Sequence, residues 1–325
     1  MLSGINQGRG IEPLLFLLFI NELAELLERY SVKVKLFADD VKVYLKIVNE
    51  CDADVLQAAL NELVKWAASW QLTVSVDKCL ILYIGKSTLN RHFFINASRL
   101  PVVSSCRDLG VIVSNDFSQS AHINVIVAKA HQRANAILRC FTSRDNKLLI
   151  KAYVTYVRPL LEYNSVVWSP HLKQDIEKVE QVKRRFTKRL PGLISCTYSE
   201  RLNRLDLFSL ELRRLHIDLI WCYKIVFGII DINVDDFFEH SPATTTREHD
   251  HKLYKYYSRK NARIMFFCER VVGVWNSLPP DVVDFCCLKS FARTVRTVDF
   301  TKFLKCFLIF VVMNIVRSVW ATPSV

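Results

Sequence analysis

Apolar and polar residues alternate along the stretch from Val32 to Leu45, VKVKLFADDVKVYL. The apolar residues recur at every second position on either side of a short polar turn, a pattern typical of two half-buried strands. The stretch therefore predicts an antiparallel hairpin with Asp39 and Asp40 at its tip. Adjacent carboxylates repel each other unless a cation or solvent screens them, although Asp is also favoured in ordinary turns. A cation site and a plain polar turn both remain open at this point.

A helix is predicted immediately before the hairpin, from about Glu12 to Glu28. Pro13 suits its first turn, because the missing N–H of proline would have no hydrogen-bond partner there. The helix begins with an apolar run, Leu14–Ile20, which is followed at once by polar residues and is far too short to span a membrane. We therefore expect this run to be buried in the protein.

A second helix is predicted after the hairpin, capped by Asp52 or Asp54. Its large apolar residues share one face: Leu56, Leu60, Leu63, Val64, Ala67 and Trp70. Further strands are predicted at Leu72–Val76, Leu80–Ile84, Arg91–Ile95 and Leu109–Val113. Helices and strands thus both occur in the first part of the chain, and the predicted fold class is α+β.

The periodicity changes at His122, where a series of amphipathic helices begins. Four helices are predicted, at about residues 122–141, 148–159, 172–186 and 209–227. Sequential helices joined by short loops form a bundle. Residues 240–257 are polar and predict a linker or an exposed loop. These changes predict three parts, residues 1–121, 122–239 and 240–325.

Composition narrows the class of protein. Lys and Arg outnumber Asp and Glu by 44 to 32, and the net charge of +12 favours a polyanionic partner. A hydrophobic content of 51% excludes a mostly disordered chain. The 10 cysteines lack regular spacing and form no CxxC, which argues against a disulfide scaffold or a structural zinc site. Without a recognisable secretory leader, we expect an intracellular protein, nuclear or cytoplasmic, with no membrane partner.

Four stretches with distinctive residues occur in a fixed order. A Gly-rich loop, SGINQGRGIEPLLF, precedes FADD of the hairpin, and then WQL leads to Lys78 and Cys79 before a turn with LGV. In this order they resemble the reverse transcriptases of non-LTR (LINE-like) retrotransposons, in which a loop like SGVPQGSVLGPLLF is followed by FADD, WQL…KC and LGV. The stretch from Arg263 to Pro279 also resembles RxxFF…WNxLP, a segment common downstream of the polymerase in the same elements.

This resemblance assigns roles to individual residues. Asp39 would be a catalytic metal ligand and Asp40 a supporting carboxylate, with Mg²⁺ as the cofactor or Mn²⁺ in its place. Incoming nucleotide and template would lie beside Gln7, Gly8, Phe37, Ala38 and Lys78. The densest basic run would follow a nucleic-acid backbone through Lys183, Arg184, Arg185 and Lys188. The alternative for this run is a solvated helix face with Phe186 packed inward.

The resemblance implies a partial reverse-transcriptase palm followed by a helical thumb-like bundle. The implied reaction is RNA-directed DNA synthesis by two-metal nucleotidyl transfer, with an RNA template, a DNA primer and deoxynucleoside triphosphates. The family's third carboxylate and its finger strands precede the Gly-rich loop, so we expect this chain to be inactive alone. The alternative is a truncated or repurposed remnant that binds nucleic acid or a partner without catalysis. Asn6, Arg9 and Glu12 stand where the family usually has Pro, Ser and Gly.

Overall fold

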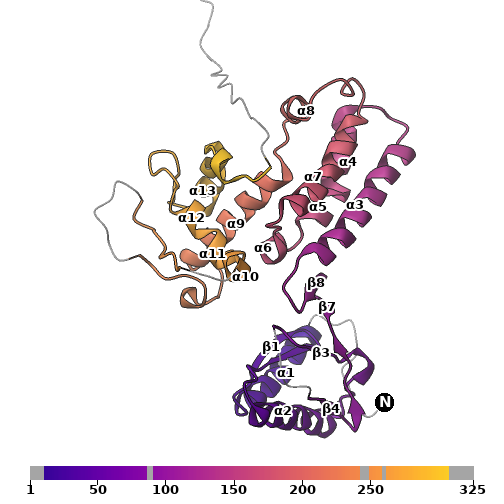
Figure 1. Ribbon diagram of the computed structural model, residues 1–325, viewed down its shortest axis with the longest axis vertical. Coiled ribbons are helices and arrows are strands. Elements are labelled where there is room, and N and C mark those ends of the chain that lie inside the picture. The colour runs from indigo at the N-terminus through magenta and orange to yellow at the C-terminus, as the bar shows by residue number, and fades with distance from the viewer. Residues whose placement is uncertain (1–10, 86–90, 242–248, 258–260, 307–325) are drawn as a thin grey trace, which may run out of the picture. The chain divides into compact units, whose positions relative to one another are not determined.

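The computed structural model describes residues 11–85, 91–241, 249–257 and 261–306. Helices and strands both occur, as the α+β prediction requires (Figure 1). The chain divides into two compact units. The first contains the residues up to Cys106 together with Ser114–Asp116, and the second contains Arg107–Val113 and the residues from Phe117 onward.

The first unit contains two long helices and several short strands. In chain order its elements are α1 (Glu12–Glu28), β1 (Lys33–Phe37), β2 (Asp40–Tyr44), α2 (Glu50–Ser69), a 3-10 turn (Val76–Lys78), β3 (Ile81–Leu82), β4 (Phe94–Ile95), β5 (Ser98–Arg99) and β6 (Val102–Val103). The β1–β2 and β4–β5 pairs are antiparallel, and β3 pairs with β6 in parallel. Strands β7 (Ser105–Asp108) and β8 (Val111–Ser114) form a further two-stranded sheet.

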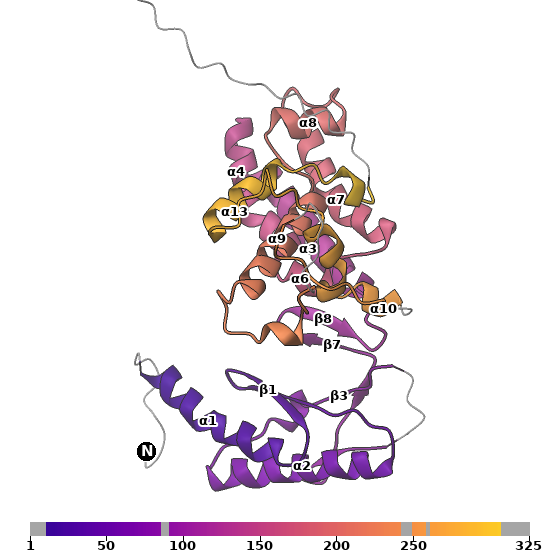
Figure 2. The same ribbon diagram turned by 90° about the vertical axis from the view of Figure 1, so that its left-hand side faces the viewer.

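Helix α1 has the predicted bounds, but its apolar start is not buried as expected. Ile20, Leu23 and Leu27 pack against the hairpin and α2, and Figure 2 shows α1 and the hairpin above α2. The leucines of the first turns are exposed instead: Leu14, Leu15, Leu17 and Leu18. The prediction of a buried run was wrong, because only one face of α1 meets the hairpin and α2.

Helix α2 begins earlier than predicted. Its N-cap is Asn49, whose side chain accepts a hydrogen bond from the backbone of Asp52, and the Asp52 carboxylate accepts one from Asn49 N at 3.0 Å. Asp52 therefore completes a capping box and is not itself the cap. The predicted strand Leu72–Val76 is also wrong, because residues 72–75 are irregular and a 3-10 turn follows them.

The second unit is mostly helical, and the helices predicted after His122 are confirmed. Its helices are α3 (Ser120–Cys140), α4 (Asn146–Tyr156), α5 (Arg158–Glu162), α6 (Ser165–Trp168), α7 (Lys173–Lys188), α8 (Tyr198–Arg204), α9 (Leu210–Val226), α10 (Asn261–Ile264), α11 (Phe267–Arg270), α12 (Val272–Trp275) and α13 (Leu288–Thr294). Short 3-10 turns lie at Val234–Asp236, Val295–Thr297 and Thr301–Phe303. In Figure 1, α3, α4, α5 and α7 lie side by side.

Two hydrophobic cores lie within this second unit, and α9 contributes to both. Leu210, at the start of α9, belongs to a core built mainly from α3, α4 and α7, in which the rings of Tyr153 and Phe186 lie 4.9 Å apart. Leu219, further along α9, belongs to a second core with Trp275 and residues from α11 to α13. The helix thus connects the helices that precede it with the C-terminal elements that follow it.

The WNxLP segment has a structural role in the second core. Trp275 is fully buried, and its indole N–H donates to the carbonyl of His251 at 2.7 Å. The Asn276 side chain accepts a hydrogen bond from Leu253 N at 2.9 Å and donates to Leu253 O at 2.7 Å. His240 also pairs with Leu253 in a β-bridge. The described ends of the polar stretch 240–257 are therefore anchored to the C-terminal core.

Candidate active site and nucleic-acid interface

Asp39 and Asp40 lie at the exposed tip of an antiparallel hairpin, as the alternation predicts. Phe37 pairs with Asp40, so only Ala38 and Asp39 form the turn. Ala38 has a φ of +50°, in the left-handed region that favours glycine. A two-residue hairpin turn needs such a residue, because the flanking strands must reverse direction while keeping their right-handed twist. The turn therefore holds two carboxylates next to each other in contact with solvent.

Only one face of the hairpin packs against the core that α1 and α2 share. Val34 is buried, and Leu36, Val41 and Val43 are partly buried against the core that α1 and α2 share. On the same strand Phe37 is 61% exposed, next to the carboxylates. The sequence alternation thus places a rigid apolar base beneath the pair and leaves an aromatic ring free beside it.

Carboxylate oxygens at the tip suit a hard divalent ion. Mg²⁺ prefers oxygen ligands and retains several waters, so one or two carboxylates are enough to hold it. Asp39 and Asp40 supply this type of ligand on a short turn. Among the residues that the structure describes, however, no group of three or more His, Cys, Asp or Glu side chains is placed to hold a metal ion. The tip thus fits part of a metal site.

Of the residues assigned to nucleotide and template, Phe37 and Ala38 belong to the hairpin, whereas Gln7, Gly8 and Lys78 lie apart from it in sequence. Gln7 and Gly8 fall outside the described residues. Lys78 is exposed at the end of the 3-10 turn that begins at Val76. Ala38 is exposed in the hairpin turn. The structure thus brings Phe37 and Ala38 to the carboxylate pair within one element, and it gives Lys78 an accessible ammonium group.

Lys183 does not lie on the surface, so its predicted contact with a nucleic-acid backbone is wrong. Only 1% of Lys183 is exposed, and its ammonium group donates to the carbonyl of Phe208. Burial lowers the pKa of Lys183 to about 8, because charge is unfavourable away from water. Phe186 is packed inward, as the alternative reading of this run required.

The remaining cations of the run differ in accessibility. Arg184 is half-buried, with its guanidinium 5.0 Å from the centre of the Tyr198 ring. Arg185 and Lys188 are exposed, and so is Arg189, whose guanidinium donates to the Asn135 side chain at 2.6 Å. Within the described residues, none of these three exposed cations has a carboxylate partner in an ion pair. They keep their charge available to a polyanion.

Helix α3 supplies further exposed cations, which the sequence analysis did not identify because it considered only the densest basic run. Lys129 and Arg133 are exposed one turn apart on α3, and with Leu160 of α5 they line a hollow of about 560 Å³. Asn124 bonds Lys178 and Asn135 bonds Arg189, so α3 and α7 run side by side in the same direction. We call the exposed residues Lys129, Arg133, Arg185, Lys188 and Arg189 the α3–α7 cations.

A regional charge count would have identified this surface from the sequence. Residues 120–204 contain 16 Lys and Arg and 6 Asp and Glu, so they carry most of the net charge of the chain. Two of the acidic residues, Asp175 and Glu180, are buried and do not screen the surface. The net charge of a helical region can be counted without knowing which face of each helix is exposed, whereas a short basic run indicates a surface only if that face is exposed.

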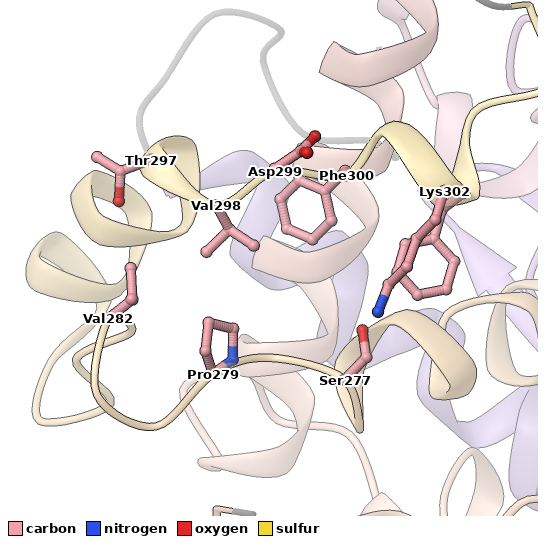
Figure 3. A pocket seen from close by; sticks show the side chains of 9 residues that line it. Ser277, Pro279, Val282, Thr297, Val298, Asp299, Phe300 and Lys302 are labelled. Atoms are coloured by element: carbon pink, nitrogen blue, oxygen red, sulfur yellow. The ribbon is translucent and has the colours of Figure 1, made fainter. Parts of the chain in front are cut away.

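A second hollow lies in the C-terminal part of the chain, with a volume of about 300 Å³. Figure 3 shows Pro279 and Val298 at its apolar base, with Ser277 and Lys302 pointing toward one another at one end. The Asp299 carboxylate accepts a hydrogen bond from Thr301 N at 2.9 Å, so it is engaged locally. None of the residues assigned above to metal, nucleotide or nucleic acid lines this hollow.

No helix in the described part of the chain is both long and apolar enough to cross a membrane.

Comparison with known proteins points to one family. Residues 2–113 match the model of the family described as reverse transcriptase (RNA-dependent DNA polymerase). The RNA-directed DNA polymerase from mobile element jockey of Drosophila funebris is 23% identical over 202 residues, which are 58% of this chain and 22% of that protein. Its counterpart in Drosophila melanogaster is 21% identical over 201 residues, with the same shares of the two chains. An uncharacterised protein of Caenorhabditis elegans is 25% identical over 120 residues, 36% of this chain and 61% of that protein.

The match to the jockey polymerases thus spans about a fifth of their length, 22% in each case. No solved structure matches the chain. The matched family region contains the hairpin with Asp39 and Asp40. Residues 2–113 are therefore similar to reverse transcriptases, and the chain is similar to the RNA-directed DNA polymerases of mobile element jockey.

Proposed function

We propose that these 325 residues are part of an RNA-directed DNA polymerase that copies an RNA template from a DNA primer with deoxynucleoside triphosphates. The observation that carries the proposal is the pair Asp39 and Asp40 at the exposed tip of a two-residue hairpin, inside the region that matches the reverse transcriptase family. Nucleotidyl transfer needs closely spaced carboxylates on a rigid element, because they fix divalent ions relative to the substrate.

In this proposal Asp39 and Asp40 would hold Mg²⁺, or Mn²⁺ in its place. The chemistry that a bound divalent ion supplies is activation of the primer 3′-hydroxyl and neutralisation of the triphosphate. Phe37 lies against the primer end with its exposed ring, and Ala38 keeps the turn narrow. By the same proposal Gln7 and Gly8, which fall outside the described residues, would contact the incoming nucleotide and template, and the exposed ammonium group of Lys78 would neutralise phosphate charge.

The same proposal extends to the division of the chain. Residues 1–121 form part of a palm with a connecting hairpin, residues 122–239 form a thumb-like helical region, and residues 240–325 form a linker and C-terminal extension. Arg185 and Lys188 support the second part, because they are exposed on a helix next to α3. Helix α9, which contributes to both cores, would make the second and third parts move together.

Replacing Asp39 by Asn should weaken Mn²⁺ binding by roughly tenfold or more, because even an outer-shell partner of a metal ligand typically contributes that much affinity. Binding is measured by titrating the purified chain with Mn²⁺ and following the paramagnetic signal of the free ion. Asp281→Asn, which removes another exposed carboxylate, serves as the control and should leave the affinity unchanged. Equal affinities for Asp39→Asn and the unsubstituted chain would remove the metal-site proposal.

The same preparation should not extend a primer on an RNA template with Mg²⁺ or Mn²⁺. Two metal ions carry four positive charges, and the described residues place only the Asp39–Asp40 pair at the tip, where water also competes. Extension that is present in the unsubstituted chain and lost in Asp39→Asn would show that these 325 residues hold a complete polymerase site.

The second candidate function is nucleic-acid binding without catalysis, by a truncated or repurposed remnant. The α3–α7 cations favour it, because they are exposed and have no carboxylate partners among the described residues. Phosphate contacts of this kind release counterions, so the affinity should fall steeply as the salt concentration rises. They carry no sequence information, so binding should be insensitive to sequence.

The combined variant Arg185→Gln, Lys188→Gln and Arg189→Gln should lower nucleic-acid affinity by roughly tenfold and reduce the salt slope by about two to three. Fluorescence anisotropy with a labelled duplex at several salt concentrations measures both quantities. Lys147→Gln, Lys151→Gln and Arg204→Gln together remove the same charge from exposed positions on α4 and α8 and serve as the matched control. Equal losses for the two triple variants would mean that net charge, and not the α3–α7 cations, determines binding.

A further inference from the structure

Three tyrosines stand exposed on a short segment of the C-terminal part, where the chain reads KLYKYY from Lys252. Tyr254 and Tyr256 are each 46% exposed, and Tyr257 is 88% exposed. We call these three residues the tyrosine platform. A tyrosine ring has a large apolar area that is ordinarily placed against protein or a ligand. Consecutive exposed rings therefore call for an explanation.

The segment is fixed to the protein immediately before the platform. Leu253 is buried, and the Asn276 side chain bonds both its N–H and its carbonyl. Tyr254 N donates to Glu239 O at 2.7 Å, and Ser241 N donates to Lys252 O at 3.0 Å. The backbone of Lys252–Tyr254 is thus tied to two separate parts of the chain. A ligand that contacts the Tyr254 ring would not need to order this backbone first.

Two of the three rings are in contact. Tyr254 and Tyr256 meet edge to face, with ring centres 5.0 Å apart at an angle of 81°. The Tyr256 hydroxyl donates to the Glu239 carboxylate, which fixes the direction of this ring. Tyr254 therefore packs against a fixed neighbour, and Tyr257 is the most exposed of the three.

Positive charge borders the platform. The Arg263 guanidinium lies 6.0 Å from the centre of the Tyr256 ring, and Lys255 stands between Tyr254 and Tyr256 in the sequence. The Glu239 carboxylate accepts from Tyr256, and Glu269 forms an ion pair with Arg263 at 3.1 Å, whereas Asp250 is exposed nearby in the sequence. Aromatic rings interleaved with cations match a polymer that has flat apolar groups and regularly spaced negative charges.

We propose that the tyrosine platform binds single-stranded nucleic acid, with unpaired bases stacked on Tyr254 and Tyr257 and with Lys255 facing phosphates. The faces of bases in a duplex are covered by their neighbours, so only a single strand can offer them to the rings. Stacking is tolerant of sequence because every base has a flat face. The proposal rests on the proposed function only in taking nucleic acid as the partner, and its residues are separate from the hairpin tip and the α3–α7 cations.

The test measures binding of a fluorescent 12-nucleotide single strand, as RNA and as DNA, and of a 12-base-pair duplex, to the full chain. Tyr254→Ala and Tyr257→Ala should each lower single-strand affinity by about tenfold, because each removes one stacking surface. Both variants should leave duplex affinity and the salt slope unchanged, because stacking involves no counterion release. Tyr254→Phe and Tyr257→Phe should retain most of the affinity, because the ring remains.

Tyr156→Ala is the control, because it removes from α4 a tyrosine that is 51% exposed, close to the 46% of Tyr254. Equal losses for Tyr156→Ala and Tyr257→Ala, equal losses on duplex, or a loss in the Phe variants as large as in the Ala variants would overturn the proposal. So would an unchanged single-strand affinity in both Ala variants. If the unsubstituted chain self-associates in sedimentation and Tyr257→Ala abolishes this, the platform is a protein contact instead. If single-strand binding were lost in the triple variant of Arg185, Lys188 and Arg189 but kept in both tyrosine variants, the proposed nucleic-acid function would stand. Only the tyrosine platform would then be ruled out.

Discussion

Replacing Arg270 by Met should lower the free energy of unfolding by about 3 to 5 kcal/mol, as is typical when one partner of a buried ion pair is removed. The Arg270 guanidinium donates two hydrogen bonds of 2.9 Å to the two carboxylate oxygens of Asp218. It also donates to the carbonyls of Met265 at 3.0 Å and Val166 at 2.8 Å. Without it, a buried carboxylate and two carbonyls would lose their partners.

Burial already raises the pKa of Asp218, and Arg270 opposes that rise. The Arg270→Met variant should therefore unfold more readily, because the Asp218 carboxylate keeps only the weaker attraction of Arg214. Arg270→Lys should recover only part of the loss, because an ammonium group cannot form the two parallel hydrogen bonds to Asp218. Urea denaturation followed by tryptophan fluorescence measures these differences.

The double variant Asp218→Leu and Arg270→Met distinguishes a lost ion pair from lost packing. It removes both charges, so it should be considerably more stable than Arg270→Met alone. Lys65→Met, which breaks an exposed ion pair with Glu62, is the control and should change stability by less than about 1 kcal/mol. A loss in Arg270→Met no greater than in Lys65→Met would show that the contacts of Arg270 do not hold α9 and α11 together.

Lys183 should make the stability of the chain depend on pH in the alkaline range. Its pKa is about 8 in the folded protein and near 10.5 for an exposed lysine, so the unfolded chain binds the proton more tightly. The free energy of unfolding should therefore rise with pH between about 8 and 10.5, by about 3 kcal/mol in total. Below pH 8 both states are protonated, and the cost of the buried charge is constant.

The Lys183→Met variant isolates this contribution. The unfolding free energy of the unsubstituted chain minus that of Lys183→Met should increase by about 3 kcal/mol from pH 7 to pH 11. Tyrosines and cysteines also titrate in this range, but they are common to both proteins and cancel in the difference. Lys188→Met removes an exposed lysine from the same helix, so its difference should stay constant. A constant difference for Lys183→Met as well would mean that Lys183 remains charged throughout this range.

Lys183 and Arg270 also show how buried polar contacts link the helices. Lys183 connects α7 to the carbonyl of Phe208, just before α9, and Arg270 connects α11 to α9 and to the carbonyl of Val166 in α6. Both lie in one compact unit, so a change at either should be felt across the helices that share its cores. Arg185 and Lys188, two of the surface positions proposed to contact nucleic acid, lie on α7. Their position therefore depends on the buried polar contacts.

The candidate site was predictable where its geometry is local. The two strands that hold Asp39 and Asp40 are adjacent in sequence, and their pairing needs only a turn of Ala38 and Asp39. The alternation of apolar residues determines which face of this hairpin meets the core, because a shift of one residue would expose Val34. The position of the carboxylate pair at the tip thus followed from the pattern. Its chemistry came from the resemblance to a family and remains a proposal.

The nucleic-acid surface was predictable only in part. Charge within the basic run identified α7, but the pattern could not show which of its cations are accessible. Val179, Val182 and Phe186 define one apolar stripe, which leaves Lys183 at its border. The partners Lys129 and Arg133 lie on another helix, more than 50 positions earlier than Lys188, and no local pattern connects them.

The sequence by itself determined the bounds of α1 and of the long helices after His122, the hairpin and the position of its carboxylates, because each depends on periodicity within one segment. Only the tertiary structure decided which faces of these elements are covered. Helix α7 contacts α3 on one side and α8 and α9 on the other, so Lys183 became buried beside a backbone carbonyl although its neighbours Arg185 and Lys188 stayed exposed. Helix α1 is covered on a single face, so its first leucines are exposed in spite of their hydrophobicity. Burial depends on what packs against an element, and that information is spread over segments far apart in the chain.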